Sequence, residues 1–126
     1  MGILRTKRIY DEVSDDDGWR VLVDRLWPRG VKKPDAHLDE WAKQVTPSPE
    51  LRKAFHAGDL DFAGFSHAYR AELDANPDAV AFATACSSRL EEGDVTLLYA
   101  SKARENHAVV LLDWLEEHGC GLNAND

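Results

Sequence analysis

Cysteine is scarce in this sequence, and long hydrophobic runs are absent from it. The two cysteines, Cys86 and Cys120, lie far apart and lack the spacing of metal ligands. No apolar run approaches the roughly 18 residues that a membrane-spanning helix needs, and the first residues lack the charged-then-apolar pattern of a signal peptide. We therefore expect a cytoplasmic domain with reduced cysteines and no membrane contact.

Common catalytic and nucleotide-binding motifs are also missing. The sequence contains no G-x-S-x-G, G-x-x-x-x-G-K-[ST], G-x-G-x-x-G or H-E-x-x-H pattern. These absences exclude the motif-based assignments to serine hydrolases, P-loop proteins, dinucleotide-binding domains and zinc proteases. The histidines are scattered without the spacing of metal ligands. We expect neither a metal nor a cofactor.

Positive charge is in deficit, since the net charge is −8. Such a chain is unsuited to coating nucleic acid, because non-specific binding depends on Lys and Arg that neutralise phosphates. The remaining positive charge is concentrated: between Arg20 and Lys33, five basic residues accompany a single acid, Asp24. A net-acidic protein with one basic patch suits a small anionic ligand better than a polymer.

The chain has the size and composition of one globular domain. It has 126 residues, of which 44% are hydrophobic and 30% are charged. No repeat, low-complexity tract or long linker divides it. We predict a single domain over residues 1–126, with a frayed tail from about residue 120.

Three segments have the character of β-strands: residues 7–10, 20–24 and 95–99. The second and third are nearly all apolar, which is typical of strands buried on both faces. The helices predicted between them allow these two strands to lie parallel through a long crossover. The connection between the first two strands is too short for a helical crossover, so the orientation of the first strand stays open.

Apolar residues at helical spacing predict five helices. They begin at Asp35, Ser48, Asp61, Pro77 and about Asn106. The first carries Leu38, Trp41 and Val45 on one face, and the last ends at Gly119. Together these elements predict an α/β fold: a small, mostly parallel sheet of few strands, flanked by about five helices.

Two loops are expected at the carboxyl ends of the buried strands, where open α/β sheets bind ligands. One is residues 24–30 and the other is residues 101–107, which opens a helix whose N-terminus favours an anion. Arg25 and Arg29 would bind phosphate or carboxylate bidentately, and Lys102 would add a point charge. Each basic residue alone is equally explained by solubility or surface ion pairs, so the hypothesis depends on their clustering.

Other polar residues in these loops have both a functional and a structural interpretation. Asp24 could be a general base or could hold Arg25 or Arg29 in place, and we favour the structural role. His107 could move protons or be an ordinary surface histidine. The candidate catalytic residues are Asp24 and His107, and the candidate ligand-binding residues are Arg25, Arg29, Tyr99, Lys102 and Asn106. A helix cap suffices to explain Asn106, and Tyr99 could instead pack its ring.

Several long segments match one known family. They are Arg20-Val-Leu-Val-Asp-Arg-Leu-Trp-Pro-Arg-Gly-Val-Lys-Lys33, Asp39-Glu40-Trp41, Thr46-Pro47-Ser48-Pro49-Glu50-Leu51-Arg52, Val95-Thr96-Leu97-Leu98-Tyr99-Ala100 and Asn106-His107-Ala108. In these segments, which extend over nearly the whole chain, it closely resembles the YeaO-like branch of the domain-of-unknown-function family 488. The resemblance implies a compact α/β domain, but it implies no activity, because the family has none assigned.

The chain departs from the wider family at one informative place. Members of that family resemble one another in having a cysteine and a Cys-His-Arg sequence after the strand that corresponds to residues 95–99. This chain instead has Tyr99-Ala100-Ser101-Lys102 and Asn106-His107-Ala108 there. The departure argues against thiol chemistry and leaves His107 as the functional group of that region. We expect Cys86 to be inert packing on a helix and Cys120 to lie in the frayed tail.

Two functions follow from these observations. The first is an enzyme or binding domain for a small phosphorylated or carboxylated ligand or a nucleotide. The alternative is a non-catalytic regulatory or interaction protein whose basic loop contacts an acidic partner or nucleic acid, although no helix-turn-helix signature accompanies it. A third possibility is that the two loops contact each other only as structure. The oligomeric state and the existence of catalysis stay open.

Overall fold

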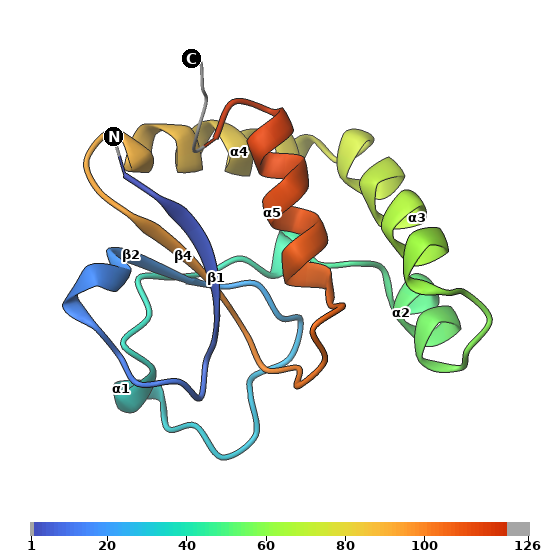
Figure 1. Ribbon diagram of the computed structural model, residues 1–126, viewed down its shortest axis with the longest axis horizontal. Coiled ribbons are helices and arrows are strands. Elements are labelled where there is room, and N and C mark those ends of the chain that lie inside the picture. The colour runs from blue at the N-terminus through green and yellow to red at the C-terminus, as the bar shows by residue number, and fades with distance from the viewer. Residues whose placement is uncertain (1, 121–126) are drawn as a thin grey trace.

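A computed structural model describes residues 2–120, and within them four strands form one wholly parallel sheet (Figure 1). The strands are β1 (Leu4–Arg8), β2 (Trp19–Leu22), β3 (Glu40–Trp41) and β4 (Val95–Tyr99). Their spatial order is β1-β4-β2-β3, so β4 and β2 are the inner strands. The predicted α/β class, the parallel pairing of the two apolar strands and their central position are confirmed.

The first strand lies earlier in the chain than the predicted residues 7–10. β1 pairs in parallel with β4, from Leu4 opposite Val95 to Arg8 opposite Tyr99. Its polar residues are held by partners distant in sequence: Arg5 forms an ion pair with Asp94 at 2.7 Å. Such partners leave no local pattern, so the apolar pair Ile9 and Tyr10 drew the predicted strand too far along the chain. The chain crosses from β1 over β4 to β2 without an α-helix.

In the described part of the chain, five α-helices accompany the sheet: α1 (Lys33–Ala36), α2 (Pro49–His56), α3 (Phe62–Asp74), α4 (Pro77–Leu90) and α5 (His107–Glu117). The last four begin where the sequence predicts them. The side chains of Ser48, Asp61, Asn76 and Asn106 each accept a backbone N–H of the helix that follows. In Figure 1, α2 and α3 extend away from the sheet at the right, and α1 lies at the lower left.

The helix predicted from Asp35 through Val45 is wrong. α1 is a single turn that ends at His37, which has a positive φ of 49°. The chain then pairs with β2, where Asp39 N–H donates to the Arg20 carbonyl at 2.9 Å and Ala42 N–H donates to the Leu22 carbonyl at 2.8 Å. These ladder hydrogen bonds satisfy the backbone as strand β3, so tertiary pairing overrides the helical spacing of the apolar residues.

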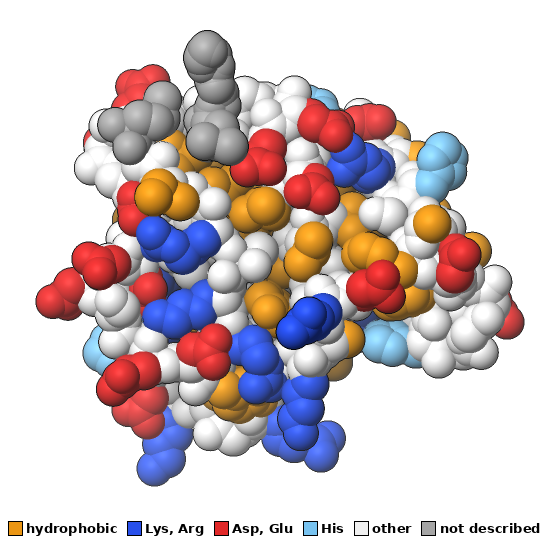
Figure 2. Space-filling view, in the orientation of Figure 1, with side chains coloured by type: hydrophobic (Ala, Val, Ile, Leu, Met, Phe, Trp, Pro, Cys, Tyr) orange, Lys and Arg blue, Asp and Glu red, His pale blue; other side chains and the backbone are white. Residues whose placement is uncertain are grey.

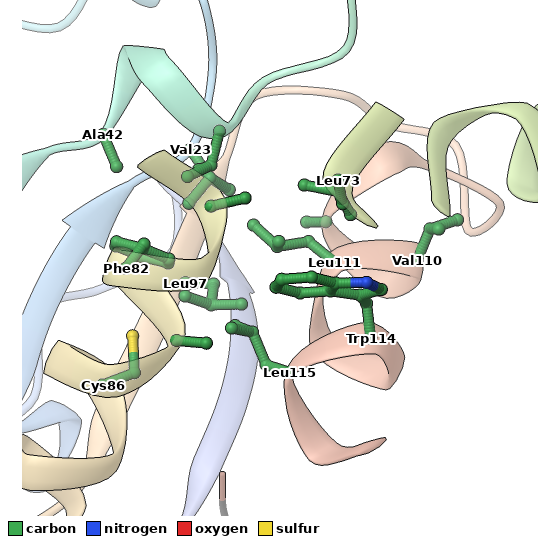
Figure 3. Close-up of a cluster of buried hydrophobic side chains, with 14 of the residues drawn as sticks. Val23, Ala42, Leu73, Phe82, Cys86, Leu97, Val110, Leu111, Trp114 and Leu115 are labelled. Carbon is green, nitrogen blue, oxygen red and sulfur yellow. The ribbon is translucent and has the colours of Figure 1, made fainter. Parts of the chain in front are cut away.

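The core lies on both faces of the sheet because successive strand residues point to opposite faces. On one face, Val23 and Leu97 meet side chains of α3, α4 and α5, including Trp114 and Leu115 (Figure 3). On the other face, Leu22, Leu98, Ile9 and Ala36 form a smaller cluster, against which Trp27, Val31 and Trp41 pack. The segment after β2 therefore acts as a covering layer for the second face.

Both cysteines are buried free thiols. Cys86 lies on the inner face of α4, as predicted, and burial raises its pKa. The expectation that Cys120 lies in a frayed tail is wrong, because Cys120 is fully buried and its Sγ donates to the Ala83 carbonyl at 3.2 Å. Burial raises the pKa of Cys120 to about 11. Burial of both thiols in the core argues against a nucleophilic role. The rest of the predicted tail, residues 121–126, lies outside the described residues.

A buried ion pair between Arg20 and Asp17 lies near the amino end of β2. The guanidinium group of Arg20, a residue of the basic segment, is only 4% exposed and donates to Asp17 Oδ2 at 2.5 Å. It also donates to the carbonyls of Ala36 and His37, while Lys7 Nζ contacts Asp17 Oδ1 at 2.9 Å. Burial raises the pKa of Asp17, but the hydrogen bonds from Lys7, the Ser14 N–H and Arg20 outweigh it and lower the pKa overall.

Substitution Asp17→Asn is expected to lower the free energy of unfolding at pH 7 by about 3 kcal/mol, because it leaves the Arg20 charge buried without a counter-charge. The folded-state pKa of Asp17 lies below its ordinary value of 3.8. The contribution is therefore complete above pH 3.8 and is lost as the pH falls through the folded-state pKa. Urea unfolding of both proteins should show a stability difference that narrows in acid.

The matched control is Asp15→Asn in the same turn, where the side chain is exposed. Its stability should stay within about 0.5 kcal/mol of wild type at every pH. Equal effects of the two substitutions, or a difference that grows in acid, would contradict the role of the Asp17 pair.

Candidate functional site

The loops that follow the two inner strands face each other across a cleft. The β2–α1 loop (residues 23–32) and the β4–α5 loop (residues 100–106) leave adjacent carboxyl ends of the sheet. Together with α2 they line a cleft with a volume of about 1140 Å³. Figure 2 shows Lys and Arg side chains gathered along the lower edge of the molecule, where Figure 1 places both loops. The cleft therefore lies where parallel α/β sheets bind ligands.

Asp24 connects the two loops. Its Oδ2 accepts the N–H of Ala100 at 2.9 Å, and its Oδ1 lies 3.0 Å from Nε2 of His107. Oδ1 is shielded from solvent and has no hydrogen bond of ordinary geometry within residues 2–120. Among those residues Asp24 makes no ion pair with Arg25 or Arg29. Its structural role is thus to join the carboxyl ends of β2 and β4 rather than to position an arginine.

His107 is the first residue of α5, and its ring lines the cleft. Nε2 lies 2.9 Å from the Val23 carbonyl and 3.0 Å from Asp24 Oδ1. Because both neighbours are hydrogen-bond acceptors, Nε2 must carry a proton. Only Nδ1 is left for proton exchange with a ligand.

Asn106 is buried and serves as the cap of α5. Its Oδ1 accepts the N–H groups of Ala108 and Val109, and its Nδ2 donates to the carbonyls of Ala103 and Arg104. The first amides of the helix are therefore already occupied. Although the helix N-terminus borders the cleft, we do not include its amides in the site.

Four arginines line the cleft: Arg25, Arg29, Arg52 and Arg104. Within residues 2–120, none of their guanidinium groups has a hydrogen bond, an ion pair or an aromatic partner. Every other arginine has one: Arg5 contacts Asp94, Arg8 contacts two carbonyls, Arg20 contacts Asp17, Arg70 contacts Glu117, and Arg89 lies over the ring of Trp19. The arginines without a protein partner are thus gathered at one place.

Some predicted residues are not at the cleft, and some cleft residues were not predicted. Tyr99 packs against the larger core, and Lys102 is exposed; neither lines the cleft. Arg52 and His56 of α2 do line it. Their spacing of four residues places them on one helix face, a signal visible in the sequence. Their position beside the loops was not visible, because it depends on the packing of α2 against α3.

Tyr10, in the segment after β1, contacts the β2–α1 loop. Its hydroxyl donates to the Arg29 carbonyl at 2.7 Å, and the Arg8 guanidinium lies 4.8 Å from the centre of its ring. Arg8 in turn donates to the carbonyls of Ala100 and Ser101. The end of β1 and the residues just after it therefore link both loops of the cleft.

The described part of the chain holds no group of three or more His, Cys, Asp and Glu side chains suited to a metal ion. No helix within residues 2–120 is long and apolar enough to cross a membrane.

The contacts of His107 predict its tautomer. In its neutral form, His107 should carry its proton on Nε2, because Val23 O and Asp24 Oδ1 both require a donor there. Long-range nitrogen–proton correlation NMR distinguishes a protonated ring nitrogen from an unprotonated one. The exposed His67 provides the comparison and should show a mixture of tautomers. A neutral His107 with its proton on Nδ1 would contradict this geometry.

Comparison with known proteins identifies relatives along almost the whole chain. A family model described as "Inactive DUF488-N3 subclade" matches residues 3–123. The uncharacterized protein YeaO of Escherichia coli K12 is 48% identical over 113 residues, which cover 89% of this chain and 96% of that protein. The uncharacterized protein Rv3073c of Mycobacterium tuberculosis H37Rv is 44% identical over 70 residues, which cover 56% of this chain and 59% of that protein. No solved structure matches significantly. The chain therefore belongs to the inactive DUF488-N3 subclade, as the resemblance of its segments to YeaO-like proteins predicted.

Proposed function

We propose that this domain binds a small anionic ligand in the cleft between its two loops and α2. The observation that supports the proposal is the gathering of Arg25, Arg29, Arg52 and Arg104 around the cleft without a protein partner in residues 2–120. Guanidinium groups bind phosphate or carboxylate with paired, charge-assisted hydrogen bonds. A ligand of this chemistry would supply the acceptors that the protein does not.

The charges around the cleft favour an anion within a chain whose net charge is −8. The lining acids are Asp24 and Glu105, against four arginines. The Asp24 carboxylate contacts the N–H of Ala100 and lies beside the Nε2 proton of His107, and its Oδ1 is shielded from solvent. Its repulsion of a bound anion is reduced by these neighbours, whereas the four guanidinium groups have no competing acceptor.

Binding without catalysis is the form of this function that we favour. Oδ2 of Asp24 accepts the N–H of Ala100, its Oδ1 is shielded from solvent, and Nε2 of His107 faces the Val23 carbonyl. Cys86 and Cys120 are buried in the core and do not line the cleft. The description of the matching family as inactive agrees with a binding role.

We infer a cytoplasmic setting and a small ligand rather than nucleic acid. Both cysteines are free thiols, which is usual for a reducing compartment. The strongly negative net charge opposes the approach of a polyanion over the rest of the surface, whereas a small anion meets only the cleft.

Removal of two cleft arginines should weaken anion binding. Wild-type protein titrated calorimetrically with pyrophosphate should bind it, and the double variant Arg25→Gln/Arg29→Gln should bind at least about tenfold more weakly, since each lost charged hydrogen bond contributes about 1.5–3 kcal/mol. The matched control is Lys32→Gln/Lys102→Gln, which removes the same charge from exposed residues outside the cleft.

The control should retain wild-type affinity within about threefold, because exposed charges beyond the cleft contribute only screened, long-range attraction. If pyrophosphate, phosphate and citrate all fail to bind at millimolar concentration, the proposed function is wrong. It is also wrong if the two double variants lose affinity equally.

A further inference from the structure

One wall of the cleft is aromatic, which an inorganic anion would not need. Phe55 of α2 is half-buried and lines the cleft. It stacks on the buried Phe65 of α3, with ring centres 4.4 Å apart and planes at 22°. The stack fixes the orientation of the Phe55 ring, because Phe65 is held in the core between the helices. The cleft thus contains a positioned aromatic surface.

The same helix presents a cation beside this ring. Phe55 and His56 follow Arg52 by three and four residues, so each is a neighbour of Arg52 on the surface of α2. All three line the cleft. A ligand at this wall meets an aromatic ring and a guanidinium group within one helical turn.

The β2–α1 loop adds apolar surface to the cleft. Leu26 is 69% exposed, and it lines the cleft together with Trp27 and Pro28. A ligand that covers so exposed an apolar side chain removes its surface from water, which contributes favourable free energy to binding. The cleft volume of about 1140 Å³ also exceeds what a phosphate ion fills, since small-molecule sites range over roughly 300–1,000 Å³.

We propose that the ligand is a nucleoside phosphate, whose base stacks on Phe55 and whose phosphate is bound by the cleft arginines. This inference rests on the proposed anion-binding function and adds the class of ligand. A purine or pyrimidine offers a flat π-face to the ring of Phe55 and apolar surface to Leu26, and stacking on an aromatic side chain tolerates any base. The phosphate supplies the acceptors that Arg25, Arg29, Arg52 and Arg104 lack.

Four compounds test the contributions of the base and the phosphate separately: AMP, ribose 5-phosphate, adenosine and pyrophosphate. Calorimetric titration should show that AMP binds at least about tenfold more tightly than ribose 5-phosphate, which lacks the base, and more tightly than adenosine, which lacks the phosphate. Equal affinity for AMP and ribose 5-phosphate overturns the nucleoside assignment while the anion site stands. If neither these phosphates nor pyrophosphate binds, the anion site itself is wrong.

A substitution in the aromatic wall tests the position of the base. Phe55→Leu keeps an apolar side chain against Phe65 but removes the π-face, so it should weaken AMP binding about tenfold and leave the affinity for ribose 5-phosphate unchanged. The matched control is Phe62→Leu: Phe62 belongs to the same aromatic cluster, 6.2 Å from Phe55, but does not line the cleft. It should retain wild-type affinity for AMP.

Thermal unfolding of both variants reports whether the fold is retained. Equal losses of AMP affinity in Phe55→Leu and Phe62→Leu, or no loss in Phe55→Leu, overturn the proposed stacking. An oligonucleotide that binds more tightly than AMP, with a steep dependence on salt, overturns the mononucleotide assignment in favour of a nucleic acid.

Discussion

The carboxylate of Asp24 lies where the two inner strands end, and the cleft depends on its contacts. Oδ2 accepts the N–H of Ala100, Oδ1 lies beside Nε2 of His107, and the Asp24 carbonyl accepts the indole N–H of Trp41. One residue therefore connects the end of β2 with the end of β4, the start of α5 and strand β3. Because these connections hold the two loops at a fixed separation, the side chains that extend from them enter one common space. The carboxylate serves the site by shaping it, and its Oδ1 is shielded from solvent.

The Lys and Arg side chains have different surroundings at the two ends of the sheet. Near the amino ends of β2 and β4, cations are paired within the protein: Arg20 and Lys7 with Asp17, and Arg5 with Asp94. At the carboxyl ends, the arginines of the cleft have no acceptor among residues 2–120. At the carboxyl end Arg8 also has acceptors, the carbonyls of Ala100 and Ser101, so the unpartnered cations there are the arginines of the cleft. A strongly acidic chain thus has its unpaired guanidinium groups at the place where an α/β sheet binds ligands.

The parts of this arrangement that depend on local sequence were predictable. The apolar runs at residues 20–24 and 95–99 indicated the inner strands, and Ser48, Asp61 and Asn106 marked helix starts, since a cap acts within its own turn. The position of the loops and the presence of Arg25, Arg29 and His107 at the cleft follow from the strands. Features that depend on distant partners were not predictable. Asp24 and Ala100 are 76 residues apart, β3 is defined only by its ladder with β2, Arg52 reaches the cleft through packing of α2 on α3, and Cys120 is buried against Ala83.

We propose that the arginines without a protein partner in residues 2–120 form one site. The most direct measurement is nitrogen–proton correlation NMR of the arginine Nε–H groups during titration with pyrophosphate. The signals of Arg25, Arg29, Arg52 and Arg104 should shift together and fit one dissociation constant. Those of Arg20 and Arg70, which are paired within the protein, should not move. Shifts spread evenly over all arginines, or different constants for the four cleft residues, would show that no such site exists.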